Sequence, residues 1–404
     1  MMIKSKKTKL ASAVGTAAMA MALSAPANAA ISLGGSDGWE VSYGGFINLF
    51  YTFSDFDYGN ATDEDSSHLQ EGLLPAFHTF TVKSPTVNGL TGTGQITFAP
   101  DSSGAKGKEL NKGGAEIDMR EVFFNVEGSF GTISAGRTLA LYQRQAILKD
   151  YTLFGVGAVA GADTGGTSLG RIGFGYIYPD FRTRFVYQTN VINGFQLSVG
   201  IFDPDEPGAG GLLSNNGIET DTPQFQAEAT YNTTWQGGTF NLWAGGIWQE
   251  AEVAAGTFAN TTSQDLDMSG FDFGADVTFG AFNVAGHYYE GDNLGTILLN
   301  LGSGNSFTCT AAGCNESDDD GFYLQGSYTF NGKTKLGISY GESTGDGGAT
   351  GGDLQNDMWT VGVYHDVNSW LKLVAEYSDQ HSDHLGTGGG SQVDTFSVGG
   401  FLLW

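Results

Sequence analysis

The sequence predicts an all-β fold, namely a transmembrane antiparallel β-barrel of about sixteen strands. Strand-length segments alternate apolar with polar residues, and the connections between them alternate between short turns and long loops. The composition agrees, because 15% of the residues are charged and 63 of the 404 are glycine, whereas an ordinary globular domain has about 25% charged residues. Beyond residue 29 no apolar run reaches the length of about 18 residues that a membrane-spanning helix requires.

The strand-like segments are each about 9 to 14 residues long, which is the length that a tilted strand needs to cross a bilayer. The first segment separates its apolar and polar residues onto two faces: Val41, Tyr43, Ile47, Leu49, Tyr51 and Phe53 against Ser42, Gly44, Asn48 and Thr52. The sixteen segments begin near residues 40, 75, 90, 115, 130, 172, 194, 222, 237, 267, 281, 321, 333, 356, 369 and 393.

The connections alternate strictly between short and long. Seven short turns, rich in turn-forming residues, lie at 84–89, 128–129, 192–193, 236–238, 280, 331–332 and 366–368. Eight long loops lie at about 54–74, 100–114, 138–171, 204–221, 250–266, 292–320, 342–356 and 381–392. An even-stranded barrel with both ends in the periplasm produces this pattern, with the long loops outside. We therefore expect residues 30–404 to form a single barrel domain.

Residues 1–29 predict a secretory signal peptide. Four lysines precede an apolar run from Leu10 to Ala25, and Ala27-Asn28-Ala29 follows as a cleavage site. These lysines are four of 18 basic residues, and the segment holds none of the 44 acidic ones, so its removal changes the net charge from -26 to -30. So acidic a chain is not expected to bind nucleic acid.

Acidic runs at 63–65, 203–206 and 318–320 fall in predicted outer loops. They either keep that surface hydrated or bind divalent cations that bridge to anionic lipid headgroups, because bare carboxylates would be repelled by such headgroups.

The loop at 138–171 and the strand after it predict a narrowed lumen. The loop carries too many apolar side chains to remain in water, so we expect it to fold onto another surface. The next strand places aromatic residues at alternate positions and arginines on the opposite face, which must therefore be wet. The aromatic residues are Phe181, Phe185 and Tyr187, and the arginines are Arg182 and Arg184.

The sequence resembles the Gram-negative general diffusion porins, most clearly over residues 76–203. The resemblance rests on Leu90–Gln95, on Arg120–Arg137, and on the Arg184–Tyr187 strand that precedes Gly194-Phe195. The last strand also resembles that of the family, although it ends on Trp404 where the family usually has Phe. The resemblance implies a homotrimer of sixteen-stranded barrels in the outer membrane, with the third loop folded into the lumen and opposed by basic residues.

On this resemblance, Arg120, Arg182 and Arg184 lie on the basic side of the constriction, and Lys83 lies nearer its periplasmic end. The loop lacks the Pro-Glu-Phe-Gly-Gly-like run of the best-known members, and its acids are chiefly Asp150 and Asp163.

The alternation along the strands places several other groups. Arg137 should point away from the lumen, and Glu121 should face lipid or a subunit contact, since it shares parity with Phe123. Arg144 is expected outside the basic row. The trimer contact is expected on the first five strands, whose small or polar outward groups are Gly45, Gly92, Gly94 and Glu121.

Cys309 and Cys314 are the only cysteines, in a polar loop of an exported chain. We expect a disulfide that closes the loop tip, with two free thiols as the alternative. A zinc site requires more ligands than these two, and a solvated loop suits the His381, Asp383 and His384 group better than a metal site. We expect no metal and no cofactor.

The pattern Gly166-Thr167-Ser168-Leu169-Gly170 matches the nucleophile elbow of hydrolases, which requires a strand before it and a helix after it. A glycine-rich loop precedes it here and a strand is predicted after it, so we expect no enzyme. A barrel of about sixteen strands leaves water inside. We therefore expect a channel for passive diffusion of ions and small hydrophilic solutes, surrounded by outer-membrane lipid and lipopolysaccharide. The alternatives are a solute-specific porin, a structural or adhesive barrel with a blocked lumen, and a membrane-embedded hydrolase.

Overall fold

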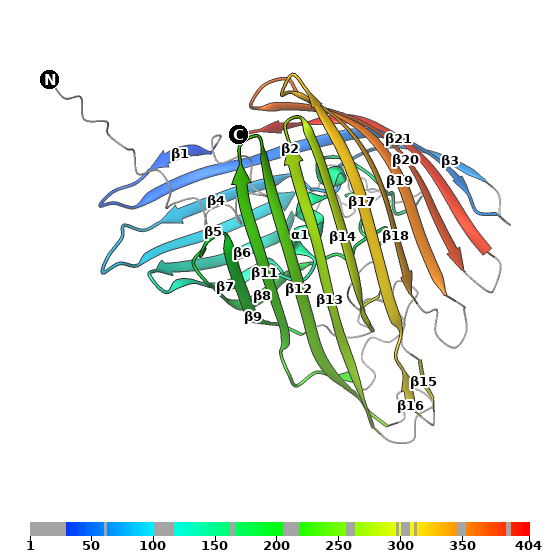
Figure 1. Ribbon diagram of the computed structural model, residues 1–404, viewed down its shortest axis with the longest axis horizontal. Coiled ribbons are helices and arrows are strands. Elements are labelled where there is room, and N and C mark those ends of the chain that lie inside the picture. The colour runs from blue at the N-terminus through cyan, green and yellow to red at the C-terminus, as the bar shows by residue number, and fades with distance from the viewer. Residues whose placement is uncertain are drawn as a thin grey trace, which may run out of the picture.

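A computed structural model describes residues 30–59, 63–100, 117–161, 166–204, 218–255, 263–295, 299, 308–310, 313–345, 353–384 and 389–404. These residues form a closed antiparallel barrel of sixteen strands (Figure 1). The first and last barrel strands close it, since Phe46 pairs with Leu403 and Asp57 pairs with Gln392. The expected signal peptide at 1–29 lies outside the described residues.

The barrel strands follow one another in chain order, and the second consists of two pieces, β3 and β4. They are β2 (Glu40–Asp57), β3 (Glu64–Gln70) with β4 (Phe77–Lys83), β5 (Thr91–Pro100), β6 (Ile117–Gly128), β7 (Gly131–Leu139), β8 (Phe181–Gln188), β9 (Phe195–Phe202), β11 (Gln224–Trp235), β12 (Gly238–Val253), β13 (Gln264–Phe279), β14 (Phe282–Asp292), β17 (Asp318–Phe330), β18 (Thr334–Gly345), β19 (Leu354–Asp366), β20 (Leu371–His384) and β21 (Gly389–Leu403).

Four further short strands lie outside this series. β1 (Ile31–Gly34) pairs with β2, and β10 (Ile218–Glu219) pairs with β12. β15 (Thr308–Thr310) and β16 (Gly313–Asn315) pair with each other as a separate hairpin beyond the end of the barrel wall (Figure 1). In the part of the chain that the structure describes, no helix is long and apolar enough to cross a membrane.

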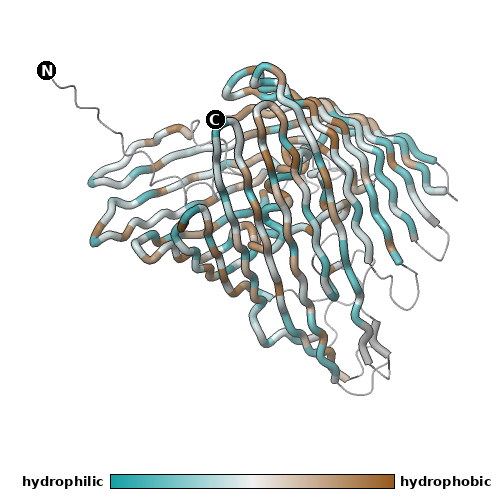
Figure 2. The backbone as a smooth tube through the Cα atoms, in the orientation of Figure 1, coloured by the Kyte–Doolittle hydropathy of each residue, from teal (hydrophilic) through white to brown (hydrophobic). Residues whose placement is uncertain are grey.

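The predicted alternation is present in the barrel wall, along which apolar and polar residues follow one another (Figure 2). In β2 the apolar residues Ile47 and Phe53 are 46% and 41% exposed, whereas the polar residues Asn48 and Thr52 are 1% exposed. The exposed apolar row is the lipid-facing surface of such a barrel, and the other row forms its inner face.

The seven predicted short turns are confirmed. They connect β4 to β5, β6 to β7, β8 to β9, β11 to β12, β13 to β14, β17 to β18 and β19 to β20. The turn between β17 and β18 shows the local cause, because Asn331 and Gly332 adopt positive φ angles of 50° and 65°. An Asn-Gly pair accepts this geometry, which matches the twist of the flanking strands.

The second barrel strand is interrupted, which the sequence did not predict. β4 pairs with the first half of β2 and β3 pairs with the second half, so residues 71–76 leave the ladder. The inner-face residue Asn48 holds this excursion, donating to Leu74 O at 2.8 Å and accepting from Gly72 N at 2.8 Å. Pro75 lies within it and has no N–H to offer a ladder.

The prediction that a strand begins near residue 172 is wrong, since β8 begins at Phe181. The alternating apolar residues before it belong to the long connection from β7. Gly173 and Gly175 have φ angles of 80° and 129°, which extended strands do not contain. The connection therefore spans residues 140–180, and we call it the β7–β8 segment.

Candidate functional site

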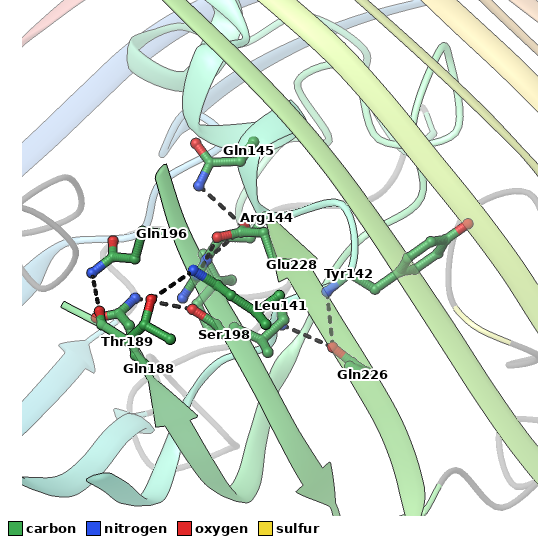
Figure 3. Close-up of polar contacts among 12 residues, drawn as sticks. Leu141, Tyr142, Arg144, Gln145, Gln188, Thr189, Gln196, Ser198, Gln226 and Glu228 are labelled. Atoms are coloured by element: carbon green, nitrogen blue, oxygen red, sulfur yellow. Dashed lines mark hydrogen bonds and ion pairs between the residues drawn. The ribbon is translucent and has the colours of Figure 1, made fainter. Parts of the chain in front are cut away.

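The β7–β8 segment begins on two polar side chains of β11 (Figure 3). Gln226 accepts hydrogen bonds from Leu141 N and Tyr142 N, each at 2.8 Å. Glu228, two residues further along the same inner row, binds the Arg144 guanidinium through both oxygens, at 3.1 Å to Nε and 2.5 Å to Nη2. Both side chains are 4% exposed or less, so this is a buried bidentate ion pair.

Two short helices continue the segment along the inner face. They are α1 (Arg144–Lys149) and the 3-10 helix η1 (Tyr151–Phe154). Lys149 pairs with Asp276 of β13 at 3.3 Å. Gln325 of β17 accepts from Tyr151 N at 3.1 Å and donates to the Lys149 carbonyl, and Tyr323 donates to Ala146 O at 3.0 Å.

A second buried carboxylate, Glu376 of β20, receives the next turn of the segment. One of its oxygens accepts from Val156 N at 2.6 Å and Gly157 N at 3.1 Å, and the other accepts from the Tyr364 hydroxyl at 2.6 Å. Gly155 permits this approach, because a Cβ there would overlap the Glu376 carboxylate. The segment is thus bound to β11 at one end and to β20 further along.

The apolar residues of the segment pack against the barrel's inner face, as expected from their number. Ile147, Leu153 and Val156 are buried in one cluster with residues of β2, β4 and β21, among them Phe46, Phe50, Phe77 and Phe401. Burial of each such side chain stabilises the folded state by about 1.5–3 kcal/mol relative to leaving it exposed to water. The segment is therefore a packed part of the fold.

Arg182 and Arg184 lie on the inner face, as the alternation predicts, and each is 8% exposed. Arg184 donates to Leu139 O at 2.6 Å, and its guanidinium lies 6.0 Å from the Phe202 ring centroid. Arg182 donates to Asp203 O at 2.9 Å. Phe181 does not face lipid as expected: it is buried, and the Arg120 guanidinium lies 5.4 Å from its centroid.

Arg120 occupies an irregularity in the ladder that reverses the parity of β6. Thr97 pairs with Glu121 but Phe98 pairs with Met119, so Arg120 is an extra residue. Its guanidinium donates to the Tyr178 hydroxyl at 2.7 Å and pairs with Asp118 at 2.6 Å. Arg120 thus contacts the end of the β7–β8 segment.

The prediction that Glu121 faces lipid is wrong. Glu121 is 5% exposed and accepts hydrogen bonds from Gln95 and Thr97 at 2.7 Å and from Thr138 at 2.8 Å. Phe123, which shares its parity, is also buried, whereas Val122 is exposed. The prediction took the aromatic Phe123 as lipid-facing and therefore assigned Glu121 to the same outer row.

The other expected site residues lie in different surroundings. Lys83 ends β4 opposite Glu40, beside a short turn, and is exposed. Asp150 is buried and serves the local fold, since it accepts from Thr152 N at 2.9 Å, the Thr152 hydroxyl at 2.6 Å and the Tyr176 hydroxyl at 2.9 Å. Asp163 lies outside the described residues.

Sequence reasoning missed the importance of Arg144. It was expected outside the basic row and without a special part, yet it forms the buried pair with Glu228. Its position in an apolar loop was a usable signal, because a buried guanidinium requires a partner. Arg137 is exposed and shares parity with Ile133, as predicted.

Cys309 and Cys314 lie directly opposite each other in the β15–β16 hairpin. Directly paired residues of antiparallel strands have Cα atoms about 4.5–5.5 Å apart, which lies within the range that a disulfide spans. The disulfide remains a prediction.

The closed barrel, its apolar outer face and the long segment bound along its inner face define an outer-membrane channel protein. The sequence model of Gram-negative porins matches residues 15–385, and the chain belongs to this family. It is accordingly a protein of the Gram-negative outer membrane. No curated protein sequence matches it.

Solved structures of similar fold include outer-membrane channels. The channel DcaP of Acinetobacter baumannii has a TM-score of 0.64 at 13% identity, covering 92% of this chain and 99% of its own. An anion-selective porin from Comamonas acidovorans has a TM-score of 0.62 at 14% identity, covering 91% and 100%. OmpT, an outer membrane protein of Vibrio cholerae, has a TM-score of 0.53 at 18% identity, covering 92% and 99%. Likeness at these identities concerns the fold alone.

Proposed function

We propose that this porin is a water-filled channel for passive diffusion of ions and small hydrophilic solutes, and that the β7–β8 segment crosses its lumen at the narrowest point. The observation that carries the proposal is the series of contacts from the segment to inner-face side chains, from Glu228 of β11 to Glu376 of β20. A segment fixed on both sides of the inner face narrows the path at a defined position.

The charge at this narrow point comes chiefly from the barrel wall. Arg120, Arg182 and Arg184 are the basic row that we propose to act on passing ions, with Lys83 nearer the short-turn end. Arg184 is bound by a carbonyl and a ring, and neither cancels its charge. Asp150 supplies negative charge on the side of the segment, because its hydrogen bonds come from the neutral hydroxyls of Thr152 and Tyr176 and leave its charge in place.

Two measurements test this function. Purified protein in planar bilayers should give stepwise conductance increments in KCl, and liposomes that contain it should swell in sugars at rates that fall with sugar size. A rate that saturates with one sugar would instead indicate a solute-specific porin. Absence of both conductance and swelling would indicate a structural barrel with a blocked lumen.

We propose further that residues 1–29 direct export and that three copies associate through the wall of the first five barrel strands, β2 to β7. Gly94 lies on the outer face of β5, and a Cβ there would meet no atom within 4 Å, so the surface has room for a neighbour. Gly94→Trp should therefore separate the trimer into single subunits on unheated gels. Gly326→Trp, an outward glycine on the distant β17, is the control. A single-subunit band from the native protein would contradict the trimer.

A further inference from the structure

Lys335, on the inner face of β18 near a short turn, is held between two aromatic rings. Its ammonium nitrogen lies 4.3 Å from the ring centroid of Tyr151, in the β7–β8 segment, and 4.5 Å from that of Tyr364, on β19. Such cation–π contacts attract the ammonium group to the face of each ring. The two rings therefore fix the position of the ammonium group.

Two glycines provide the space in which these rings lie. Gly337 and Gly362 are paired across β18 and β19 at the next inner-face positions. A Cβ at Gly337 would lie 2.9 Å from the Tyr151 ring, and a Cβ at Gly362 would lie 2.6 Å from the Tyr364 hydroxyl oxygen. Larger residues at these two positions would displace the rings from Lys335.

Each ring is also fixed at its hydroxyl. Tyr151 donates to Asn283 Oδ1 at 2.6 Å, and Tyr364 donates to Glu376 Oε1 at 2.6 Å. The lysine is consequently held by groups from β14, β19, β20 and the β7–β8 segment, and this arrangement does not depend on any ligand.

The charge of Lys335 is not cancelled by a neighbouring acid. Among the described residues no carboxylate oxygen lies within 4.0 Å of its nitrogen, so Lys335 has no direct ion pair. Asp150 and Glu376 keep their negative charges, because Thr152, Tyr176 and the segment backbone that bind them are neutral, but both act on Lys335 from beyond that distance. Asp366 pairs with Lys372 at 2.5 Å. An aromatic face attracts a cation but carries no net charge, so the two rings do not neutralise the ammonium group.

Lys372 adds a second cation on the same part of the inner face. It lies on β20, separated from β18 only by β19, and its nitrogen is 5.7 Å from the Phe154 ring centroid. Its partner Asp366 is 53% exposed, so water weakens that pair. Lys335 itself is half-buried on the inner face, and among the described residues no hydrogen bond uses its N–H donors.

We propose that Lys335, supported by Lys372, is a binding subsite for small oxyanions on the short-turn side of the β7–β8 segment. This inference rests on the proposed function, since it requires a conducting lumen. A small anion passing the segment would exchange water for the ammonium donors of Lys335 and the field of both lysines. Phosphate and carboxylate solutes share the required chemistry, namely negatively charged oxygens that accept hydrogen bonds.

Single-channel recording in KCl tests the subsite, with inorganic phosphate or acetate added to both chambers. Phosphate should reduce the chloride current of the native channel in a saturable manner. Lys335→Met should raise the half-blocking concentration about tenfold, as expected for loss of one contact charge. Lys335→Arg, which keeps the charge, should stay within about threefold of the native value. A stronger block by acetate than by phosphate would assign the subsite to carboxylate solutes.

Lys333→Met is the matched control, because it removes the same charge two residues away in the exposed turn. It should leave the block unchanged. Equal half-blocking concentrations in the native, Lys335→Met and Lys333→Met channels would overturn the subsite while leaving the channel function intact. A native protein without conductance would instead contradict the proposed function itself. Heat-modifiable gel migration of each variant verifies that the barrel is folded.

Discussion

The buried pair of Arg144 and Glu228 gives the most direct test of how the β7–β8 segment is held. Glu228→Gln keeps the size of the side chain and removes its charge, leaving Arg144 buried without a counter-ion. Removing one partner of a buried ion pair costs about 3–5 kcal/mol. Even the lower figure shifts the equilibrium from the bound to the released α1 by roughly 150-fold.

The barrel should survive this change, because the strand ladder is untouched and Gln226 still binds Leu141 N and Tyr142 N. Release should be confined to α1 and the residues after it. We expect faster trypsin cleavage after Arg144 and Lys149 in the folded, detergent-solubilised protein, together with greater open-channel noise. Glu290→Gln, an exposed outer-face glutamate, is the control and should change neither.

A double variant separates the lost pair from general damage. Arg144→Met with Glu228→Met removes both charges, and replacing a whole buried pair with apolar groups is often neutral or stabilising. Cleavage after Lys149 should therefore return toward the native rate. The reasoning is refuted if Glu228→Gln is cleaved no faster than the native protein, or if the double variant is cleaved as fast as Glu228→Gln.

Three further predictions concern charge and covalent structure. Replacing Arg182 and Arg184 with Ala should lower the anion-to-cation permeability ratio, measured as the reversal potential across a KCl gradient. Ala at the exposed Arg137 should leave this ratio unchanged. Equal shifts of the reversal potential in both variants would show that Arg182 and Arg184 do not line the constriction. On the outer face, Asp394 pairs directly with both Asp55 and Asp379, and such opposed like charges repel. Asp394→Asn should thus raise the melting temperature by about 1–2 °C in dilute salt. In about 1 M salt, where the Debye length is about 3 Å, the rise should be small. The same rise at both salt concentrations would exclude electrostatic repulsion as the cause. Peptide mapping without reductant should find Cys309 and Cys314 in one cross-linked peptide, and alkylation of both thiols in unreduced protein would contradict the disulfide.

The barrel can be predicted from the sequence, because apolar and polar residues alternate along each strand. This alternation arises because one face of each strand contacts lipid. Turns such as Asn331-Gly332 have their own local signal. Prediction fails where the sequence pattern fits both faces. Phe123 and Phe124 are adjacent aromatic residues, and Phe124 is the one that faces outward, so Glu121, which shares the parity of Phe123, lies inside. The extra residue Arg120 then reverses the parity between Glu121 and Met119, and nothing in the sequence near it distinguishes this from regular alternation.

The site is less predictable, because its partners are distant in the chain. The inward positions of Arg182 and Arg184 follow from alternation alone. That Arg144 meets Glu228, or that Lys335 lies between Tyr151 and Tyr364, depends on where the β7–β8 segment runs along the inner face. Hydrophobic content shows that the segment must be covered, but not which strands cover it.

The anchors of the β7–β8 segment also determine the order in which the molecule can fold. Arg144 and Glu228 are separated by 84 positions, and Val156 and Glu376 by 220, so the second anchor forms only after nearly the whole chain has joined the sheet. Contacts between such distant positions form late, because the entropy of closing the intervening chain opposes them. Until then the segment can be attached to β11 but not to β20, and the cluster around Leu153 and Val156 lacks the residues that β20 and β21 contribute, Val374 and Phe401. During that interval apolar side chains are exposed on the inner face of the open sheet. The last strands, β20 and β21, both close the wall and cover these side chains.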